Sequence, residues 1–338
     1  MLENNDNNQT AVLVPLPIGL DRQEASAAVT LAQPAANSAR VVVCDVDSPY
    51  LRSLRARADK LFYRMPYPGN AGDSLIQFAT DTLLRDMGIR TTVDPRAAEV
   101  ILVPGGNPSM WHDIGAGHWQ QVWVKFPQAE FMVGPAGFRR GYSDWARIIN
   151  DHGTRVSGLF ARDPDSFKTL RDSGLRSEIT VGLSDDPALY LRGSEWLRAH
   201  RSAATDEYVL AAFRDDHETD DSCKTPFGVP RNMVPGRIHH MLSHRQAARV
   251  RSRKLAHAAK SFRHSLPLVC LDVSKQRFEL FVETVRAALE VHTDRLHVML
   301  LAAMLGKKVH AYPTSHSKLE GVYQYSLARW ADVNFVTI

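Results

Sequence analysis

The stretch VHTDRLHVMLLAAMLGKKVHAYP, residues 291–313, decides the fold class of this chain. Eight residues, from Val298 to Leu305, carry no polar side chain, and their spacing predicts a helix that ends at Gly306. The following KVHAYP predicts a strand. A helix that is apolar on all sides is buried in a protein interior. A buried helix followed at once by a strand is typical of α/β proteins.

Strands and helices alternate on the N-terminal side of that stretch as well. The first series of predicted elements comprises strands at 40–46, 98–107, 130–137, 156–162 and 177–189, with helices at 72–89 and 163–174. The second series comprises strands at 206–214 and 266–273 and helices at 275–290 and 316–330, in addition to the opening stretch. Such alternation indicates βαβ units and parallel sheets. We expect an α/β fold with two Rossmann-like domains whose parallel sheets face a cleft.

The two series also predict the domain organisation. Residues 1–39, rich in Asn, Gln, Ala and Ser, are expected to form a flexible N-terminal arm. The expected domains are an N-terminal Rossmann-like domain at 40–195 and a C-terminal one at 205–312, followed by a helix and tail at 313–338.

Composition excludes some classes of protein. The chain has 338 residues, 44% of them hydrophobic and 23% charged, which is ordinary for a globular protein. No run approaches the roughly 18 apolar residues that a membrane span needs. The N-terminus lacks the basic and apolar regions of a signal peptide, and the three cysteines form no metal-type spacing. We expect a cytoplasmic protein, either free or associated with the inner face of the membrane.

Positive charge is concentrated in one segment. The net charge is +4, yet residues 222–271 hold ten Lys or Arg and no Asp or Glu. Within it, the basic segment 222–264 is also histidine-rich and helical in propensity. His240 and His244 have the i, i+4 spacing of a metal pair, but no third ligand is evident, so a solvated histidine face is favoured and no metal is expected. Three alternatives stay open for the segment: it holds the diphosphate of a lipid-linked oligosaccharide, it contacts an anionic membrane, or it is simply a solvated basic helix.

The start of the apolar helix is the first candidate site. Ligands of α/β proteins gather at the carboxyl ends of strands, where helix N-termini attract anions. Thr293 is the expected N-cap, which places Arg295 in the first turn. A cation is unfavourable there unless an anion lies in front of it. His297 adds a second donor, and both side chains reach one ligand only if Arg295 precedes the regular turns or if each flanks the ligand. The alternative is a salt bridge from Arg295 to Asp294 and a core histidine.

Three further turns follow the same strand-then-helix logic. YPGNAGDSLI (67–76) places Gly69, Asn70, Gly72 and Asp73 before a helix, although Asp73 could simply cap it. VPGGNPSMW (103–111) contains Gly105, Gly106 and Asn107, where glycines allow a ligand close approach or merely form a turn. LFARDPDS (159–166) brings Arg162 to a strand end, with a salt bridge to Asp163 or Asp165 as the alternative.

Taken together, the motifs resemble a known family. GNAGD, GGN, ARDPDS, DDPAL and TDRLHVMLLAAMLGKKV followed by SKLEG, in this order over about residues 60–330, resemble the polysaccharide pyruvyl transferases. The nearest likeness is to the exopolysaccharide pyruvyl transferases of bacterial capsule and biofilm operons. The resemblance implies two Rossmann-like domains arranged as in GT-B glycosyltransferases. It also implies transfer of the enolpyruvyl carbons of phosphoenolpyruvate to a sugar, giving a pyruvate ketal and phosphate without metal or nucleotide. The segment 222–264 has no counterpart in the family pattern.

The resemblance assigns roles to the candidate residues. Arg162, Arg295 and His297 would surround phosphoenolpyruvate, with His297 as general acid and Arg295 stabilising the departing phosphate. Asp73 would be the base or the acceptor of a sugar hydroxyl. The remaining residues expected to bind substrate are Asn70, Gly72, Gly105, Gly106, Asn107, Asp186 with its neighbour Asp185, and Lys318. The alternatives are a GT-B-type glycosyltransferase with a nucleotide-sugar donor, and a non-catalytic protein that binds nucleic acid or lipid.

Overall fold

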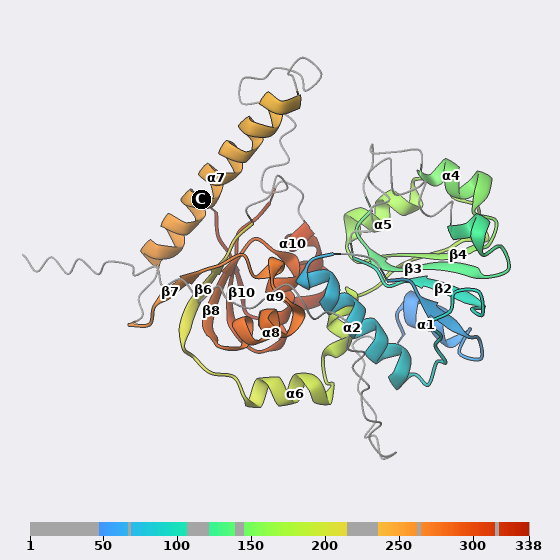
Figure 1. Cartoon of the computed structure of the whole chain (residues 1–338), viewed down its shortest axis with the longest axis horizontal. Coiled ribbons are helices and arrows are strands. Elements are labelled where there is room, and N and C mark those ends of the chain that lie inside the picture. The colour runs from blue at the N-terminus through green and yellow to red at the C-terminus, as the bar shows by residue number, and fades with distance from the viewer. Residues whose placement is uncertain are drawn as a thin grey trace, which may run out of the picture.

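The computed structural model describes residues 47–66, 69–106, 122–138, 145–214, 236–261, 265–314 and 318–337, with the side chains of the helix at 236–261 described from 248 to 260. These residues form two α/β domains, each built on a parallel five-stranded sheet (Figure 1). The predicted α/β class with two Rossmann-like domains is therefore confirmed. The predicted arm at 1–39, the predicted strand at 40–46 and Asn107 lie outside the described residues.

The N-terminal domain has the strand order β1-β2-β3-β4-β5. Its strands are β1 (Phe62–Arg64), β2 (Val100–Val103), β3 (Glu130–Ala136), β4 (Val156–Ala161) and β5 (Thr180–Leu183). Its helices are α1 (Pro49–Arg55), α2 (Ala71–Asp86), α4 (Trp145–His152), α5 (Pro164–Arg171) and the 3₁₀ turn η2 (Pro187–Leu191). The helices α1 and α2 bury one face of the sheet, and α4 and α5 bury the other. Apolar side chains on both faces explain why the strands have nearly continuous hydrophobic sequences.

The C-terminal domain has the strand order β10-β9-β8-β6-β7. After the linking helix α6 (Glu195–Ser202), its strands are β6 (Tyr208–Ala212), β7 (Leu268–Cys270), β8 (Ala288–Thr293), β9 (Lys308–Ala311) and β10 (Val333–Phe335). Its helices are α7 (Gly236–Ser261), η5 (Val273–Lys275), α8 (Phe278–Arg286), α9 (Leu296–Met304), α10 (Lys318–Val322) and the π-helical turn η6 (Tyr323–Leu327). The chain passes from β6 outward to β7 and then back to β8 on the other side of β6. This reversal creates a topological switch point between β6 and β8, where ligands of α/β folds bind.

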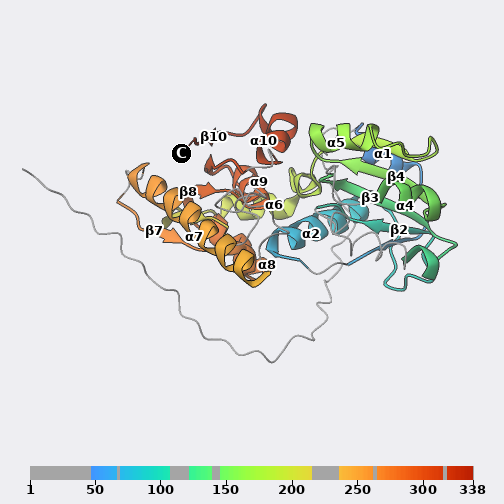
Figure 2. The same cartoon turned by 90° about the horizontal axis from the view of Figure 1, so that it is seen from above.

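The helix α2 belongs to the cores of both domains. Leu83 and Leu84 pack against the N-terminal sheet, whereas Ala71, Leu75 and Ala79 join the core that α8 and α9 form in the C-terminal domain. Figures 1 and 2 show α2 between the two sheets. Because its first turn contacts the second domain, α2 places the start of its own helix beside the start of α9.

The opposite face of the C-terminal sheet packs against α7. Ala258 of α7 shares a small core with Phe213, Tyr312 and Val336. The helix continues far beyond the sheet (Figure 1), and the predicted pair His240 and His244 lies in the part whose side chains are not described. None of the described helices is both long enough and apolar enough to cross a membrane.

Three local predictions differ from the structure. The predicted helix at 275–290 is in fact α8 followed by β8, because residues 288–293 pair with β6 and β9 and alternate between the two faces of the sheet. Thr293 is the last residue of β8 rather than the N-cap of α9, and Arg295 is the N-cap. The predicted final helix at 316–330 is shorter and continues as η6, and β10 follows it at the sheet edge.

Candidate functional site

The start of α9 lies at the switch point of the C-terminal sheet. Thr293 ends β8 and its hydroxyl both donates to Ala212 O at 2.8 Å and accepts from Arg295 N at 3.0 Å. Arg295 is the N-cap, and its side chain makes no capping hydrogen bond. Arg295 thus precedes the regular turns, which is the arrangement that lets it and His297 approach one ligand. The first N–H groups of α9 remain available to an anion.

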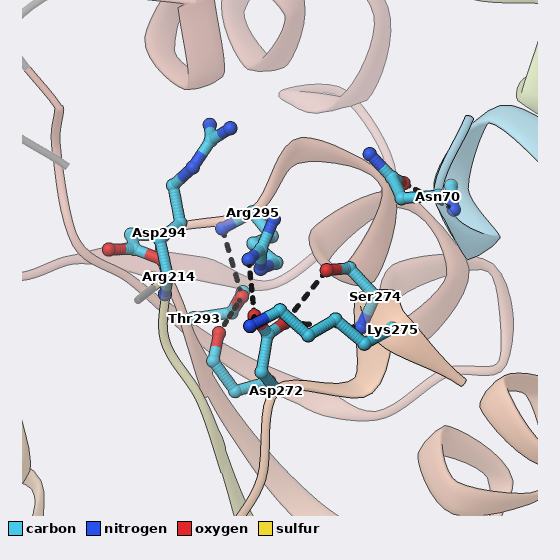
Figure 3. Close-up of polar contacts among 10 residues, drawn as sticks. Asn70, Arg214, Asp272, Ser274, Lys275, Thr293, Asp294 and Arg295 are labelled. Atoms are coloured by element: carbon cyan, nitrogen blue, oxygen red, sulfur yellow. Dashed lines mark hydrogen bonds and ion pairs between the residues drawn. The ribbon is translucent and has the colours of Figure 1, made fainter. Parts of the chain in front are cut away.

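The Arg295 guanidinium is held by a carboxylate from a neighbouring loop. Its Nη2 lies 2.6 Å from Oδ2 of Asp272, which follows β7, and both side chains are buried (Figure 3). Asp272 also accepts hydrogen bonds from Ser274, and Lys275 Nζ lies 3.9 Å from its Oδ2. Arg295 does not pair with Asp294, so the salt bridge considered from the sequence is wrong. The result is a positively charged group whose orientation is fixed before any ligand binds.

A second group forms where the two domains meet. Arg162 Nη1, at the end of β4, donates to Asp186 Oδ2 at 2.8 Å and lies 3.5 Å from His297 Nε2. His297 Nε2 in turn lies 3.6 Å from Asp186 Oδ2. Arg162 and Asp186 come from the N-terminal domain, whereas His297 comes from the first turn of α9. The two cationic residues predicted to share a ligand therefore meet across the domain boundary.

Asp186 is the anion that organises this group. It is fully buried, and its Oδ1 accepts from Ala188 N at 3.0 Å. Burial alone would raise the pKa of Asp186, but the Arg162 guanidinium and His297 outweigh burial and lower the pKa to about 2. Arg162 Nε is buried and has no hydrogen-bond partner among the described residues. An unsatisfied guanidinium donor beside a histidine is suited to bind an anionic oxygen.

The start of α2 packs against His297. Asn70 caps the helix through Gly72 N at 2.8 Å, and Asp73 Oδ2 accepts from Asn70 N at 2.9 Å, which completes a capping box. The capping role considered for Asp73 is thus present. A Cβ atom on Gly72 would lie 2.4 Å from His297 Nδ1, so only glycine lets the imidazole lie there. Asn70 lies at the start of α2, which contacts both η5, where Ser274 lies, and α9, which follows Arg295 (Figure 3).

The other predicted residues lie around this centre. Gly105 and Gly106 have φ values of +118° and +87°, and a Cβ on Gly105 would lie 2.4 Å from Pro135 O, so a backbone reason for glycine exists without a ligand. Asp185 Oδ1 accepts from Ser326 Oγ at 2.6 Å and so joins η6 to the N-terminal domain. Lys318 begins α10, whose Gly321 lies against Asp163, the residue after Arg162.

Sequence reasoning missed three residues that shape the site. Asp272 orients Arg295, and its LDVSK context, a strand end before a helix, is the same signal that marked Arg162. Arg214 is the second residue after β6 and lies beside Asp294 and Arg295 in Figure 3. Lys254 of α7 forms a buried ion pair with Asp294, and no local pattern could have indicated that pair.

The comparison with protein families identifies the family of this chain. The model of the polysaccharide pyruvyl transferases matches residues 70–316, which include both residue groups described above. The chain belongs to the polysaccharide pyruvyl transferase family. Membership makes it a transferase and implies a saccharide acceptor. Arg162, Asp186, Arg295 and His297 all fall within the family match, and Lys318 falls just outside it.

Two solved structures are similar to this chain to different extents. A functionally uncharacterized protein of Klebsiella pneumoniae is 19% identical, covers 86% of this chain and 97% of its own, and superposes with a TM-score of 0.56. A putative UDP-N-acetylglucosamine 2-epimerase from Listeria monocytogenes is 12% identical over 78% of this chain and 81% of its own, with a TM-score of 0.39. No functionally curated protein matches this polysaccharide pyruvyl transferase.

Proposed function

We propose that the protein transfers the enolpyruvyl group of phosphoenolpyruvate to a sugar of a bacterial exopolysaccharide or of its lipid-linked repeat unit. The transfer forms a pyruvate ketal and releases phosphate. The observation that carries the proposal is the meeting of Arg162 and His297 across the domain boundary, with Arg295 at the same helix start.

The charges of the site match those of the donor. Phosphoenolpyruvate carries a phosphate and a carboxylate on three carbons, and planar guanidinium groups bind such oxyanions through paired hydrogen bonds. Arg162 has an unsatisfied buried Nε, and Arg295 lies at the uncapped start of α9. Their carboxylate partners Asp186 and Asp272 fix both guanidiniums in advance, which reduces the cost of ordering them when the donor binds.

The chemistry requires one proton donor and one proton acceptor. A sugar hydroxyl attacks C2 of the enolpyruvyl group and loses its proton, while C3 gains a proton and becomes a methyl group. A second hydroxyl of the same sugar then attacks C2 as the C2–O bond to phosphate breaks, and its proton leaves with phosphate or solvent. In this scheme His297 protonates C3, Arg295 stabilises the departing phosphate, and Asp73 is the candidate acceptor of the hydroxyl proton.

In this proposal the sugar acceptor binds to the N-terminal domain and to the basic segment. Asn70 and Gly72 at the start of α2 lie next to His297, where the attacking hydroxyl has to enter. Arg249, Arg253 and Lys260 are exposed on α7. These cations suit the diphosphate of a lipid-linked acceptor or an anionic membrane surface.

The proposal is tested by incubating the protein with phosphoenolpyruvate and a β-galactoside acceptor. Phosphate should be released and the acceptor should gain an acid-labile carboxylate. His297→Ala should lower turnover by about 10²–10⁴-fold, and Arg295→Lys, which keeps a cation beside Asp272, by about 10²-fold. Arg277→Ala, an exposed arginine at the start of α8, is the matched control and should retain full activity.

The same samples separate this function from a nucleotide-sugar glycosyltransferase. Phosphoenolpyruvate should raise the melting temperature of the native protein and fail to do so in Arg295→Lys. Stabilisation by nucleotide sugars instead, with no phosphate release from phosphoenolpyruvate, would refute the proposal. Full activity of His297→Ala would refute the assigned site.

A further inference from the structure

A histidine and carboxylate cluster lies on the sheet face that packs against α7, away from α9. Glu290 and His292 are two residues apart on β8, so their side chains project from the same face. His310 on β9 is the register partner of His292, which brings it to that face as well. We call Glu290, His292 and His310 the β8–β9 cluster. It belongs to neither residue group of the candidate site.

The donor atoms of the cluster converge on one point. Glu290 Oε1 lies 2.9 Å from His292 Nε2 and 3.2 Å from His310 Nε2, and the three donor atoms all lie within 4.8 Å of one another. Ligands bound at about 2.1 Å around a tetrahedral ion are roughly 3.4 Å apart, so this spacing fits one ion. The two imidazole rings are stacked with centroids 4.5 Å apart and an interplanar angle of 9°.

In each of the three side chains, the nitrogen or oxygen atom that points away from the proposed ion has a partner of its own. His292 Nδ1 lies 3.0 Å from the Tyr312 hydroxyl, and His310 Nδ1 lies 3.3 Å from Nδ2 of Asn334. With a metal ion on His310 Nε2, the Asn334 amide is flipped, so that its Oδ1 accepts the proton of Nδ1. Lys308 Nζ donates to Glu290 Oε2 at 3.1 Å. Metal sites characteristically have such outer partners, which fix ring orientation and leave one donor atom of each residue directed inward.

The burial of the cluster side chains is an independent reason to expect a bound ion. His292 is fully buried and the Glu290 side chain is 6% exposed. His310 Nε2 is buried and makes no hydrogen bond to any described residue, although it faces Glu290. A buried ring nitrogen without a hydrogen bond is costly unless something binds it. The Lys308 side chain is 56% exposed, so an ion could enter beside it.

We propose that Glu290, His292 and His310 bind one divalent transition-metal ion of the Zn²⁺ type, with its fourth position taken by water. Two imidazoles and one carboxylate suit Zn²⁺, Co²⁺ or Fe²⁺ rather than Mg²⁺ or Ca²⁺, which prefer oxygen ligands. The ion joins β8 to β9 just before Thr293, so it holds the strand that carries Arg295 and His297. It lies on the other face of the sheet and takes no part in pyruvyl transfer.

The test uses the full chain, stripped with EDTA and then titrated with ZnCl₂ by calorimetry and with CoCl₂ by visible absorption. One ion should bind per chain, the melting temperature should rise, and Co²⁺ should give the absorption of a four- or five-coordinate site. Glu290→Gln, which preserves volume, and His310→Ala should each weaken Zn²⁺ binding by at least about 10²-fold. Circular dichroism and the melting temperature without metal establish that each variant is folded.

The pair on α7 supplies the matched control. His240→Ala with His244→Ala removes the other histidine pair that has metal-type spacing and should leave Zn²⁺ binding unchanged. Binding lost in that double variant but kept in Glu290→Gln would place the metal on α7 and overturn the proposal. No stoichiometric Zn²⁺ binding by the native chain would also overturn it. Neither outcome depends on whether the chain releases phosphate from phosphoenolpyruvate.

Discussion

The Lys254 ammonium on α7 lies 2.6 Å from Asp294 Oδ2, and both side chains are buried. Asp294 Oδ1 also accepts from Arg214 N at 2.9 Å. Asp294 directly precedes Arg295, so this ion pair joins the basic helix to the loop that starts α9. The basic helix, which has no counterpart in the family pattern, therefore supports the loop that carries Arg295.

Replacing Lys254 by Met should destabilise the C-terminal domain by about 3–5 kcal/mol, because Asp294 would keep a buried charge without a counterion. Urea unfolding followed by circular dichroism measures the change. Arg253→Met, at an exposed neighbouring position on α7, should change stability by less than about 0.5 kcal/mol. Adding Asp294→Asn to Lys254→Met removes the stranded charge and should recover part of the loss. Equal stability of native protein and Lys254→Met would contradict the importance of the pair.

Gly72→Ala should lower turnover by about 10²-fold with little change in melting temperature. The new methyl group would lie 2.4 Å from His297 Nδ1 and 2.8 Å from its Cβ, so the imidazole would have to move. Displacing a reacting group by about 1 Å can cost two orders of magnitude in rate. Phosphate release and thermal unfolding are the measurements, and Ser74→Ala in the same helical turn is the control. Unchanged turnover in Gly72→Ala would show that the position of His297 does not limit the reaction.

Asp73 has two possible roles that one pair of variants separates. Asp73→Ala removes the acceptor of Asn70 N and should destabilise α2 by about 0.5–2 kcal/mol whatever its chemical role. Asp73→Asn keeps an oxygen for that hydrogen bond but cannot take a proton. If Asp73 is the base, Asp73→Asn should lose at least about 10²-fold in turnover while remaining as stable as the native protein. Native turnover in Asp73→Asn would leave Asp73 with the capping role alone.

Local sequence patterns predicted the parts of the fold that local interactions determine. The helix α9 was predictable because its apolar residues are contiguous, and the strand ends at Gly105 and Arg162 were predictable because turn residues follow apolar runs. The strand β8 was not predictable, because Ala288 follows α8 after a single residue and the strand conformation depends on pairing with β6. That Glu290 and His292 lie on the same face of β8 can be inferred only once that pairing is known.

Long-range partners were the part of the site that the sequence could not supply. Arg162 and His297 are 135 residues apart, and their meeting depends on how the two domains pack around α2. Asp272 reaches Arg295 although β6 lies between their strands in the sheet, so the contact follows from strand order and not from sequence distance. Arg162, Arg295 and Asp186 were named from sequence motifs, whereas the contacts by which Asp186 and Asp272 orient the two arginines had to come from the structure.

The ion pair between Arg162 and Asp186 makes stability depend on pH in a defined direction. Asp186 has a pKa of about 2 in the folded protein, below its ordinary value of 3.8. A carboxyl group whose pKa falls on folding stabilises the protein above its unfolded-state pKa and loses that contribution as pH falls through the folded-state value. The difference of nearly two pKa units corresponds to about 2 kcal/mol.

Asp186→Asn should therefore be less stable than the native protein by about 3–5 kcal/mol at neutral pH, because it strands the Arg162 charge in the interior. The gap should stay constant from pH 8 to 5 and shrink by about 2 kcal/mol between pH 4 and 2, where native Asp186 takes up its proton. Urea unfolding at a series of pH values measures the gap, and Asp165→Asn, at an exposed position, should show none at any pH. A gap that instead closes between pH 8 and 6 would show that the dependence does not come from Asp186, and Asp186 would then not be the anion on which this centre is built.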